Sequence, residues 1–246
     1  RAEVNDIYHT LNLGATGLVL AAETAIGRFP TQSVEMVRKL MHEYAKKPKN
    51  LEELYTRSPL SLLVAAHGGR LVSRFSSENN KSIDCLTVEI TDLMDCEQIA
   101  IGTYSPLQGF MGEKDLYSVL ENYRLADGTV WTLPILLQIK QDDLVKVKIG
   151  EKIYLRDKDD LGKALLEVEE IFQVNKSEVA KKWFGTDDRS HPGVDQFFKK
   201  GDIFVSGKVS MIERISSGTK QFEFMPQETR TIFSMKGWSK IVGFHT

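Results

Sequence analysis

One short loop constrains the fold of this chain more than any other stretch: residues 100–112, Ala-Ile-Gly-Thr-Tyr-Ser-Pro-Leu-Gln-Gly-Phe-Met-Gly. Gly102 and Gly109 bracket a Ser-Pro pair, so the backbone has to turn tightly within a few residues. The turn brings the apolar side chains of the loop together, namely those of Tyr104, Leu107, Phe110 and Met111. The loop therefore predicts a packing element that orients two layers of the fold and is too apolar to carry chemistry itself.

The composition excludes several classes of protein. Hydrophobic residues make up 41% and charged residues 27% of the 246 residues, as in ordinary globular proteins. The net charge of −2 argues against non-specific nucleic-acid binding. No apolar run approaches the ~20 residues of a membrane helix, and no signal peptide is recognisable. The two cysteines, Cys85 and Cys96, have neither zinc-site nor disulfide-framework spacing, so we expect free thiols in a cytoplasmic protein.

Residues 1–47 differ from the rest of the chain in composition and in the spacing of their apolar residues. Apolar spacing predicts a helix over 2–13, and the continuous apolar run at 18–22 predicts a strand buried on both faces. Thr31 or Ser33 can cap a second helix that ends near Tyr44. Helix, buried strand, helix is one slice of an α/β fold, and we expect its strand to lack sheet neighbours.

Three further segments follow. Residues 48–63 are a polar linker with a short helix at 51–57 and a domain boundary near Ser58-Pro59. Residues 64–215 are rich in predicted strands, at 71–72, 86–90, 135–139, 145–149, 153–155 and 165–171, with helices at 115–123 and 176–184 and a hairpin at Asp127-Gly128. Residues 216–246 predict a helix from 227 to 235, after Pro226, and a strand at 240–244 that begins a new α/β domain.

Candidate anion sites have structural alternatives. The adjacent glycines of His67-Gly68-Gly69 could turn their N–H groups toward an anion, or they could make a turn into the strand at 71–72. His191 precedes a proline and is held extended, so it is expected to anchor its loop by a hydrogen bond, with a ligand role as the alternative. The phosphate loop G-x-x-x-x-G-K-[ST] is missing.

Two charged clusters predict solvated surface. One is a charged turn between strands, at Asp157, Asp159 and Asp160. The other is a row of lysines at alternating positions of the strand predicted at 145–149 and its continuation, at Lys146, Lys148 and Lys152. Neither cluster predicts a binding site.

Several blocks, in this order, resemble the N-terminal half of ATP sulfurylase. They are H-G-G-R-L-V-S-R at 67–74, the loop at 100–112, R-L-A-D-G-T-V-W at 124–131, F-G-T-D at 184–187, H-P-G-V at 191–194, E-T-R at 228–230 and V-G-F-H-T at 242–246. The resemblance covers residues 64–246. It implies a PUA-like pseudo-barrel over residues 64–215 and the start of a Rossmann-like catalytic domain over residues 216–246.

The same resemblance implies an activity. ATP sulfurylases join ATP and sulfate to give adenosine 5′-phosphosulfate and pyrophosphate, with Mg²⁺ accompanying ATP. Their catalytic strand ends in Q-T-R-N or H-T-R-N followed by P-x-H-R-x-H, so His245 and Thr246 would bind ATP and sulfate. Arginine, imidazole and amide donors can orient these oxygen-rich groups without a covalent intermediate. Because the 246 residues lack the remainder of that motif, we expect an inactive fragment that has no catalytic residues of its own and binds no metal.

A second resemblance covers residues 1–47. R-A-E-V-N-D at 1–6 and E-T-A-I-G-R-F-P at 23–30 look like the last βα unit of the pyruvate kinase barrel, with Ala21-Ala22 in place of Ser-Gly. It implies that Glu23 and Thr24 follow a strand at the catalytic face of a (β/α)8 barrel. One unit of eight cannot close a barrel, so no kinase site is expected from this chain.

The fold class that follows is α+β: a PUA-like pseudo-barrel between a (β/α)8 remnant and the start of a Rossmann-like domain. The leading hypothesis is a fragment of a sulfate adenylyltransferase fused to a pyruvate kinase-like segment. Two alternatives stay open: a pyruvate kinase-type phosphotransferase as the parent activity, and a non-catalytic PUA-like binding or assembly module. A homo-oligomer also remains open.

Overall fold

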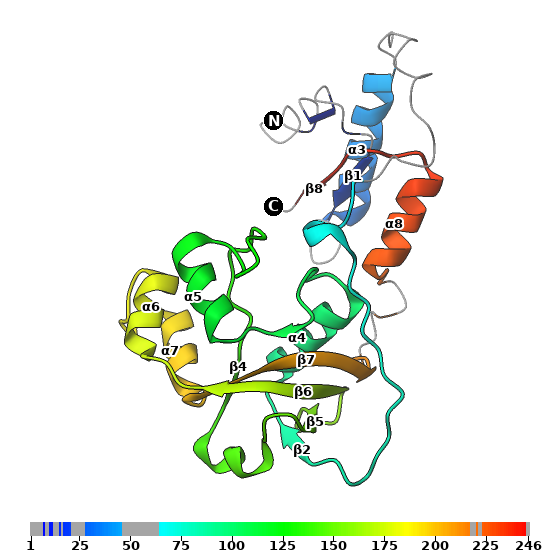
Figure 1. Ribbon diagram of the computed structural model, residues 1–246. Coiled ribbons are helices and arrows are strands. Elements are labelled where there is room, and N and C mark those ends of the chain that lie inside the picture. The colour runs from blue at the N-terminus through cyan, green and yellow to red at the C-terminus, as the bar shows by residue number, and fades with distance from the viewer. Residues whose placement is uncertain are drawn as a thin grey trace. The chain divides into compact units, whose positions relative to one another are not determined.

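The computed structural model describes residues 7, 10–11, 15, 17–20, 28–45, 64–216, 220 and 223–244. The chain divides into two compact units. One contains the described residues of 65–227, and the other contains those of 1–64 and 228–246 (Figure 1). The architecture is a mixed α+β one, and each unit is described by itself below.

The larger unit is built on a six-stranded sheet of order β2-β5-β6-β7-β3, with β4 also pairing with β7. The strands are β2 (Cys85–Thr87), β3 (Gly109–Phe110), β4 (Leu137–Ile139), β5 (Lys152–Arg156), β6 (Lys163–Phe172) and β7 (Ile203–Glu213). β6 and β7 form the long antiparallel centre of the sheet (Figure 1). β2 pairs with β5 in parallel, and the other pairs are antiparallel.

Helices surround this sheet in the larger unit. They are α4 (Ile90–Ile101), α5 (Glu113–Asn122), α6 (Lys176–Phe184) and α7 (Pro192–Lys199), with 3₁₀ turns η3 (His67–Gly69) and η4 (Gln141–Lys146). α4 lies along β7 (Figure 1). Its fully buried residues Leu93, Cys96 and Ile99 belong to the same apolar core as the inward residues of β5, β6 and β7. Burial of this core is the main source of stability in such a unit.

The smaller unit contains β1 (Gly17–Leu20), α3 (Pro30–Ala45), most of α8 (Pro226–Met235) and β8 (Ile241–Phe244). β1 and β8 pair in parallel, with Gly17 opposite Ile241 and Leu20 opposite Phe244. The expectation that the strand at 18–22 lacks neighbours was therefore wrong. Its apolar run has gained a partner from the far end of the sequence, whose strand is just as short and apolar.

Many sequence predictions are confirmed. The helix at 176–184 has the expected bounds, and the helix at 227–235 is found as α8. The helix at 115–123 and the strands at 135–139, 153–155, 165–171 and 240–244 are confirmed with small shifts. Residues 7, 10 and 11 are helical, as expected for part of 2–13. The helix expected at 51–57 lies outside the described residues.

The strand expected at 145–149 is wrong. Residues 141–146 form η4 and residues 149–150 a turn. Val145 is 78% exposed and Ile149 63% exposed, so of the three alternating apolar residues only Val147 is buried. A Lys146–Asp143 ion pair of 3.1 Å stabilises the 3₁₀ turn instead. The row of lysines at 146, 148 and 152 is accordingly not one strand face, since only Lys152 lies in a strand.

The strand expected at 86–90 is shorter than predicted. β2 ends at Thr87, and α4 begins at Ile90. The Glu89 side chain accepts from the backbone N–H of Asp92, and the Asp92 side chain accepts from that of Glu89. This reciprocal capping box starts a helix that the sequence interpretation had missed. It had also missed α7, which begins one residue after His191.

Two turns differ from expectation. After η3, residues 71–74 form no strand, and a single parallel bridge joins Phe75 to Met211. Around Asp127-Gly128 one antiparallel bridge, Arg124 with Val130, replaces a full hairpin. Backbone hydrogen bonds still hold both turns, among them Leu125 N–H to the Thr129 carbonyl at 2.8 Å and Arg74 N–H to the Ala100 carbonyl at 2.9 Å.

Candidate functional site

His245 and Thr246, the pair expected to bind ATP and sulfate, lie outside the described residues. The structure describes the strand that leads to them, β8, which ends at Phe244. Their part in a site therefore stays a prediction.

Three sequence blocks of the larger unit, at 67–74, 100–112 and 124–131, converge on one groove of about 880 Å³. It is lined by Gly68 and Arg70, by residues 106–112, by Lys114 and Asp115, by residues 125–127 and by polar residues of β6 and β7. Segments separated by up to 140 positions in the sequence thus form a single surface feature. This groove is the candidate functional site.

The His-Gly-Gly turn packs against the neighbouring loops. Gly68 has a φ of +70°, and a Cβ at this position would lie 2.5 Å from the ring of Pro106. His67 Nε2 lies 2.6 Å from the carbonyl oxygen of Val130. The backbone N–H of Gly69 donates to the carbonyl of Ala66 at 2.8 Å, so it is not free for an anion. The turn interpretation is favoured over the anion cradle.

Ser105 fixes the loop at 100–112. It is 4% exposed. Its hydroxyl donates to the carbonyl of Gly102 at 2.6 Å and accepts from the backbone N–H of Val72 at 2.9 Å. A hydroxyl can do both at once, so one side chain ties the loop to the segment after the His-Gly-Gly turn. The packing role expected for this loop is confirmed.

The carboxylates of the groove are already engaged. Glu170 Oε2 accepts from the backbone N–H of Glu113, the first residue of α5, at 3.1 Å. Asp115 accepts from the N–H of Ala126 at 2.7 Å, and Glu169 pairs with Lys208 at 3.1 Å. A negative charge at the start of a helix stabilises its dipole.

Four donor side chains in the groove remain available. Arg70, Gln108, Lys114 and Ser206 make no side-chain hydrogen bond or ion pair within the part of the chain that the structure describes. Ser206 is only 4% exposed, yet it lines the groove. Chemically, the groove can therefore receive an oxygen-bearing group from a ligand or from another polypeptide segment.

Residues 64–214 match the family described as the PUA-like domain. This match covers more than half of the chain. The chain belongs to the PUA-like domain family. The resemblance to the PUA-like region of ATP sulfurylase is shown as well, because similar proteins bear that enzyme's name.

Curated relatives of the chain include three proteins named sulfate adenylyltransferase. That of Symbiobacterium thermophilum is 33% identical over 74% of this chain and 49% of its own length. That of Chloroflexus aurantiacus is 36% identical over 76% of this chain and 49% of its own length. That of Gibberella zeae is 38% identical over 73% of this chain and 34% of its own length. The chain thus spans about half the length, or less, of these relatives.

A solved structure with the same fold is the hexameric APS kinase from Thiobacillus denitrificans. It is 23% identical to this chain, with a TM-score of 0.53, and the match covers 72% of this chain and 32% of that one. This likeness shows the fold alone.

The remaining sequence blocks of the PUA-like domain join α6 to α7. His191 is the N-cap of α7, and its Nδ1 accepts from the backbone N–H of Val194 at 3.4 Å. The expected anchoring role of His191 is thus confirmed. Asp187 accepts from the Ser177 hydroxyl and pairs with Lys181 at 3.1 Å. These contacts serve helix packing.

The carboxylate turn after β5 is also structural. Asp157 accepts from the backbone N–H groups of Asp159 at 3.0 Å and Leu161 at 2.8 Å. The turn was predicted correctly, but Asp157 is 4% exposed rather than solvated. Backbone donors satisfy its carboxylate in place of water.

Acidic residues on α4 were missed by the sequence interpretation because it placed a strand at the start of this helix. Burial raises the pKa of Asp92, against the opposing effect of Lys200. Burial, followed by the nearby charge of Asp92, raises the pKa of Asp95 to about 6, although the hydroxyl of Tyr104 donates to it at 3.4 Å. The sequence signal that could have revealed them is the capping box at 89 and 92.

No described helix is both long enough and apolar enough to cross a bilayer. Among the same residues, no group of three or more His, Cys, Asp and Glu side chains is placed to hold a metal ion.

Proposed function

We propose that the chain supplies the PUA-like domain and the start of the catalytic region of a sulfate adenylyltransferase. The reaction would join ATP and sulfate to give adenosine 5′-phosphosulfate and pyrophosphate. The observation that carries this proposal is the 33–38% identity to proteins named sulfate adenylyltransferase over about three quarters of the chain.

In this proposal His245 and Thr246 would bind ATP and sulfate. They directly follow β8, and the end of a strand in an α/β arrangement is a common place for ligand-binding groups. The 246 residues contain no R-N-x-x-H-R-x-H motif, so the other substrate-binding groups would come from elsewhere in the enzyme. Mg²⁺ would enter with ATP, and no described residue is assigned to it. We therefore expect no turnover from these 246 residues alone.

We further propose that residues 1–47 derive from a pyruvate kinase-like barrel. Support comes from the two motifs at 1–6 and 23–30, and from a strand, β1, that precedes a helix, α3, as in a βα unit. We also propose a cytoplasmic location, and a homo-oligomer is one of the assemblies that stay open.

Steady-state kinetics on the full-length protein tests the main proposal. Thr246→Val keeps volume and β-branching but removes one hydroxyl. Loss of a hydrogen bond to a charged group costs ~1.5–3 kcal/mol, so kcat/KM should fall about tenfold to over a hundredfold. Gln108→Ala tests the groove as the alternative site, because Gln108 lines it. This variant should stay within about threefold if the reaction takes place at the pair 245–246.

The assay is ATP formation from adenosine 5′-phosphosulfate and pyrophosphate, with thermal stability measured in parallel. A full-length protein with no such activity would contradict the proposed function. A silent Thr246→Val in an active enzyme would contradict only the placement of its site.

A further inference from the structure

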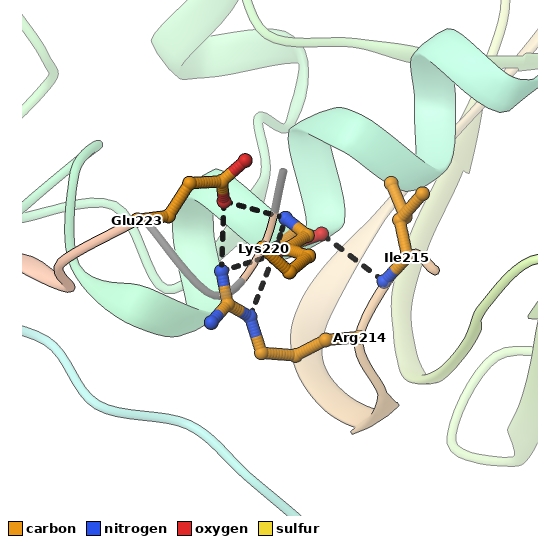
Figure 2. A network of polar contacts seen from close by, with 5 residues as sticks. Arg214, Ile215, Lys220 and Glu223 are labelled. Carbon is orange, nitrogen blue, oxygen red and sulfur yellow. Dashed lines mark hydrogen bonds and ion pairs between the residues drawn. The ribbon is translucent and has the colours of Figure 1, made fainter. Parts of the chain in front are cut away.

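The carboxylate of Glu97 lies at the centre of a polar network in the PUA-like domain. Glu97 is on α4 and is 1% exposed. Its Oε1 accepts from Arg214 Nε at 2.7 Å and from Lys220 Nζ at 2.6 Å, and it lies 2.6 Å from Arg214 Nη2. Its Oε2 accepts from the backbone N–H of Ile215 at 3.2 Å. Both oxygens of a buried carboxylate are therefore satisfied by residues that follow β7 (Figure 2).

The network contains a second carboxylate. Glu223 pairs with Lys220 at 2.9 Å and with Arg214 at 3.5 Å, so the two cations that bind Glu97 also contact Glu223. Burial acts to raise the pKa of Glu97, but the hydrogen bonds from Lys220 and Arg214 outweigh it, and the pKa lies below its ordinary value. Glu97 consequently remains ionised at neutral pH. A buried charge of this kind is stable only when it is fully paired, as Glu97 is.

The network lies on the path by which the chain leaves the PUA-like domain. β7 ends at Glu213, and the larger unit ends at Gln227. A separate contact holds the first part of this path, because the N–H of Ser216 donates to the carbonyl of Leu161 at 2.7 Å. Glu97, 117 positions before Arg214, holds the same stretch from the side of α4.

We propose that Glu97, Arg214, Lys220 and Glu223 form an exit clasp that fixes the course of the chain out of the PUA-like domain. Glu97 is then a positioning residue for the segment that follows, which carries α8, β8 and the pair at 245–246. A polar network whose members are all hydrogen-bonded is rigid. This network therefore holds the end of the larger unit in one arrangement. The consequence for turnover rests on the proposed function, whereas the clasp itself does not.

Glu97→Gln in the full-length protein tests the clasp. A glutamine has one acceptor oxygen and one NH₂ group, so in either orientation a donor faces a donor: Ile215 N–H or the two cations. Hydrogen exchange at the Ile215 amide should therefore accelerate about tenfold or more. The Ser216 amide, held by Leu161, and the amides of α4 should change by less than about threefold.

Glu121→Gln is the matched control. Glu121 lies on α5, pairs with Lys182 at 2.8 Å and is 52% exposed. The same substitution there should leave exchange at Ile215 unchanged. Unchanged Ile215 exchange in Glu97→Gln would overturn the clasp. So would equal acceleration throughout α4, since Glu97 would then support the core and not the exit.

A second variant tests the exit clasp if Glu97→Gln does not fold. Lys220→Gln removes one cation on the exit side and leaves Arg214 on Glu97. Chymotrypsin should then cut faster after Phe224, which is 67% exposed, in Lys220→Gln than in Glu121→Gln. Equal cleavage rates would overturn the clasp.

Turnover separates this inference from the proposed function. In an active sulfate adenylyltransferase, Glu97→Gln should lower kcat/KM while Glu121→Gln leaves it unchanged. A wild-type protein without that activity would contradict the proposed function, and the exchange result at Ile215 would still decide the clasp.

Discussion

The ammonium group of Lys200 lies 2.6 Å from Oδ1 of Asp92, a carboxylate whose side chain is 4% exposed. Lys200 follows the last residue of α7, and Asp92 lies in the first turn of α4. The pair joins two helices that are far apart in the sequence, and it neutralises the charge that starts α4. Glu89 lies 3.7 Å from the same ammonium group.

Lys200→Met should destabilise the PUA-like domain. Removing one partner of a buried ion pair typically costs ~3–5 kcal/mol, and the 21% exposure of Lys200 places the expected loss near the lower value. Because burial already raises the pKa of Asp92, the loss should be smaller at pH 5, where the carboxyl takes up a proton more readily. Urea unfolding at pH 5 and pH 8 measures both effects.

Lys199→Met is the control for this substitution. Lys199 is 71% exposed and pairs only with Asp195, at 2.5 Å, among the described residues. Its loss should change the free energy of unfolding by less than about 0.5 kcal/mol. Equal losses in the two variants would show that Asp92 does not depend on Lys200.

Asp95 should make stability fall as pH rises. Its pKa is about 6 in the folded protein, against an ordinary value of 3.8. Between these two values the unfolded chain has lost a proton that the folded protein still holds, so raising the pH favours unfolding. Asp95→Asn resembles the neutral form and should be more stable than wild type at pH 8, on the order of 1–3 kcal/mol.

The two proteins should be equally stable near pH 4, where the carboxyl is neutral in the folded state. Urea unfolding from pH 4 to pH 8 measures the gap between the two proteins in the free energy of unfolding. Carbon-13 NMR of the Asp95 carboxyl gives the midpoint of its titration. A gap that stays constant over this range would mean that Asp95 titrates normally.

Lys176 closes the end of α7. Its ammonium group donates to the carbonyls of Phe198, Lys200 and Gly201 at 3.2–3.3 Å and to Asp202 at 2.9 Å. Lys176→Met leaves the carbonyls of Phe198 and Lys200 short of a donor, whereas that of Gly201 still accepts from Gln138 at 2.9 Å. Each unsatisfied buried group costs ~1–3 kcal/mol. With partial solvation we expect a loss of about 2–4 kcal/mol in urea unfolding.

Lys181→Met is the matched control, because Lys181 lies on α6, the same helix as Lys176, and is 61% exposed. It should change the free energy of unfolding by less than about 1 kcal/mol. If Lys176→Met lowers the free energy of unfolding no more than this control does, water replaces the ammonium group and Lys176 contributes no net stability.

Local signals explain which elements could be predicted. α6 has a capping Asn175, buried Val179 and Ala180, and a left-handed Gly185 at its end, so its bounds follow from the sequence alone. The alternating stretch at 86–90 contains the end of β2 and the start of α4. Its strand-like period predicted a strand, although the capping box of Glu89 and Asp92 indicates the start of a helix. At 145–149 the pattern alternates, but only Val147 packs in the core, and its apolar neighbours Val145 and Ile149 are exposed.

The groove and the exit clasp could not be predicted in this way. The groove joins Arg70 to Lys208, and the clasp joins Glu97 to Lys220. Which of these side chains meet depends on the order of strands in the sheet, and no local pattern encodes it. Three sequence blocks contain segments that line the groove, but only the topology shows that these segments share one surface.

The backbone of β3 lies close against that of β7 at Gly109, and Gly109→Ala should separate the two strands. A Cβ at Gly109 would lie 1.7 Å from the carbonyl oxygen of Gly207 and 2.8 Å from the Cα of Lys208. Both neighbours are backbone atoms of the central strand, so the crowding cannot be relieved by turning a side chain. Overpacking typically costs ~1–3 kcal/mol, and we expect a loss at or above the upper value.

Thermal melting of Gly109→Ala beside Gly243→Ala measures this effect. Gly243 also lies in a strand, but a Cβ there would meet nothing within 4 Å, so its replacement should cost less than about 0.5 kcal/mol. Because β3 carries the loop that lines the groove, Gly109→Ala should also speed hydrogen exchange at the Val209 amide, which donates to the carbonyl of Gln108 at 2.9 Å. A variant that melts like wild type and keeps this amide protected would show that β3 can shift away from β7 without loss.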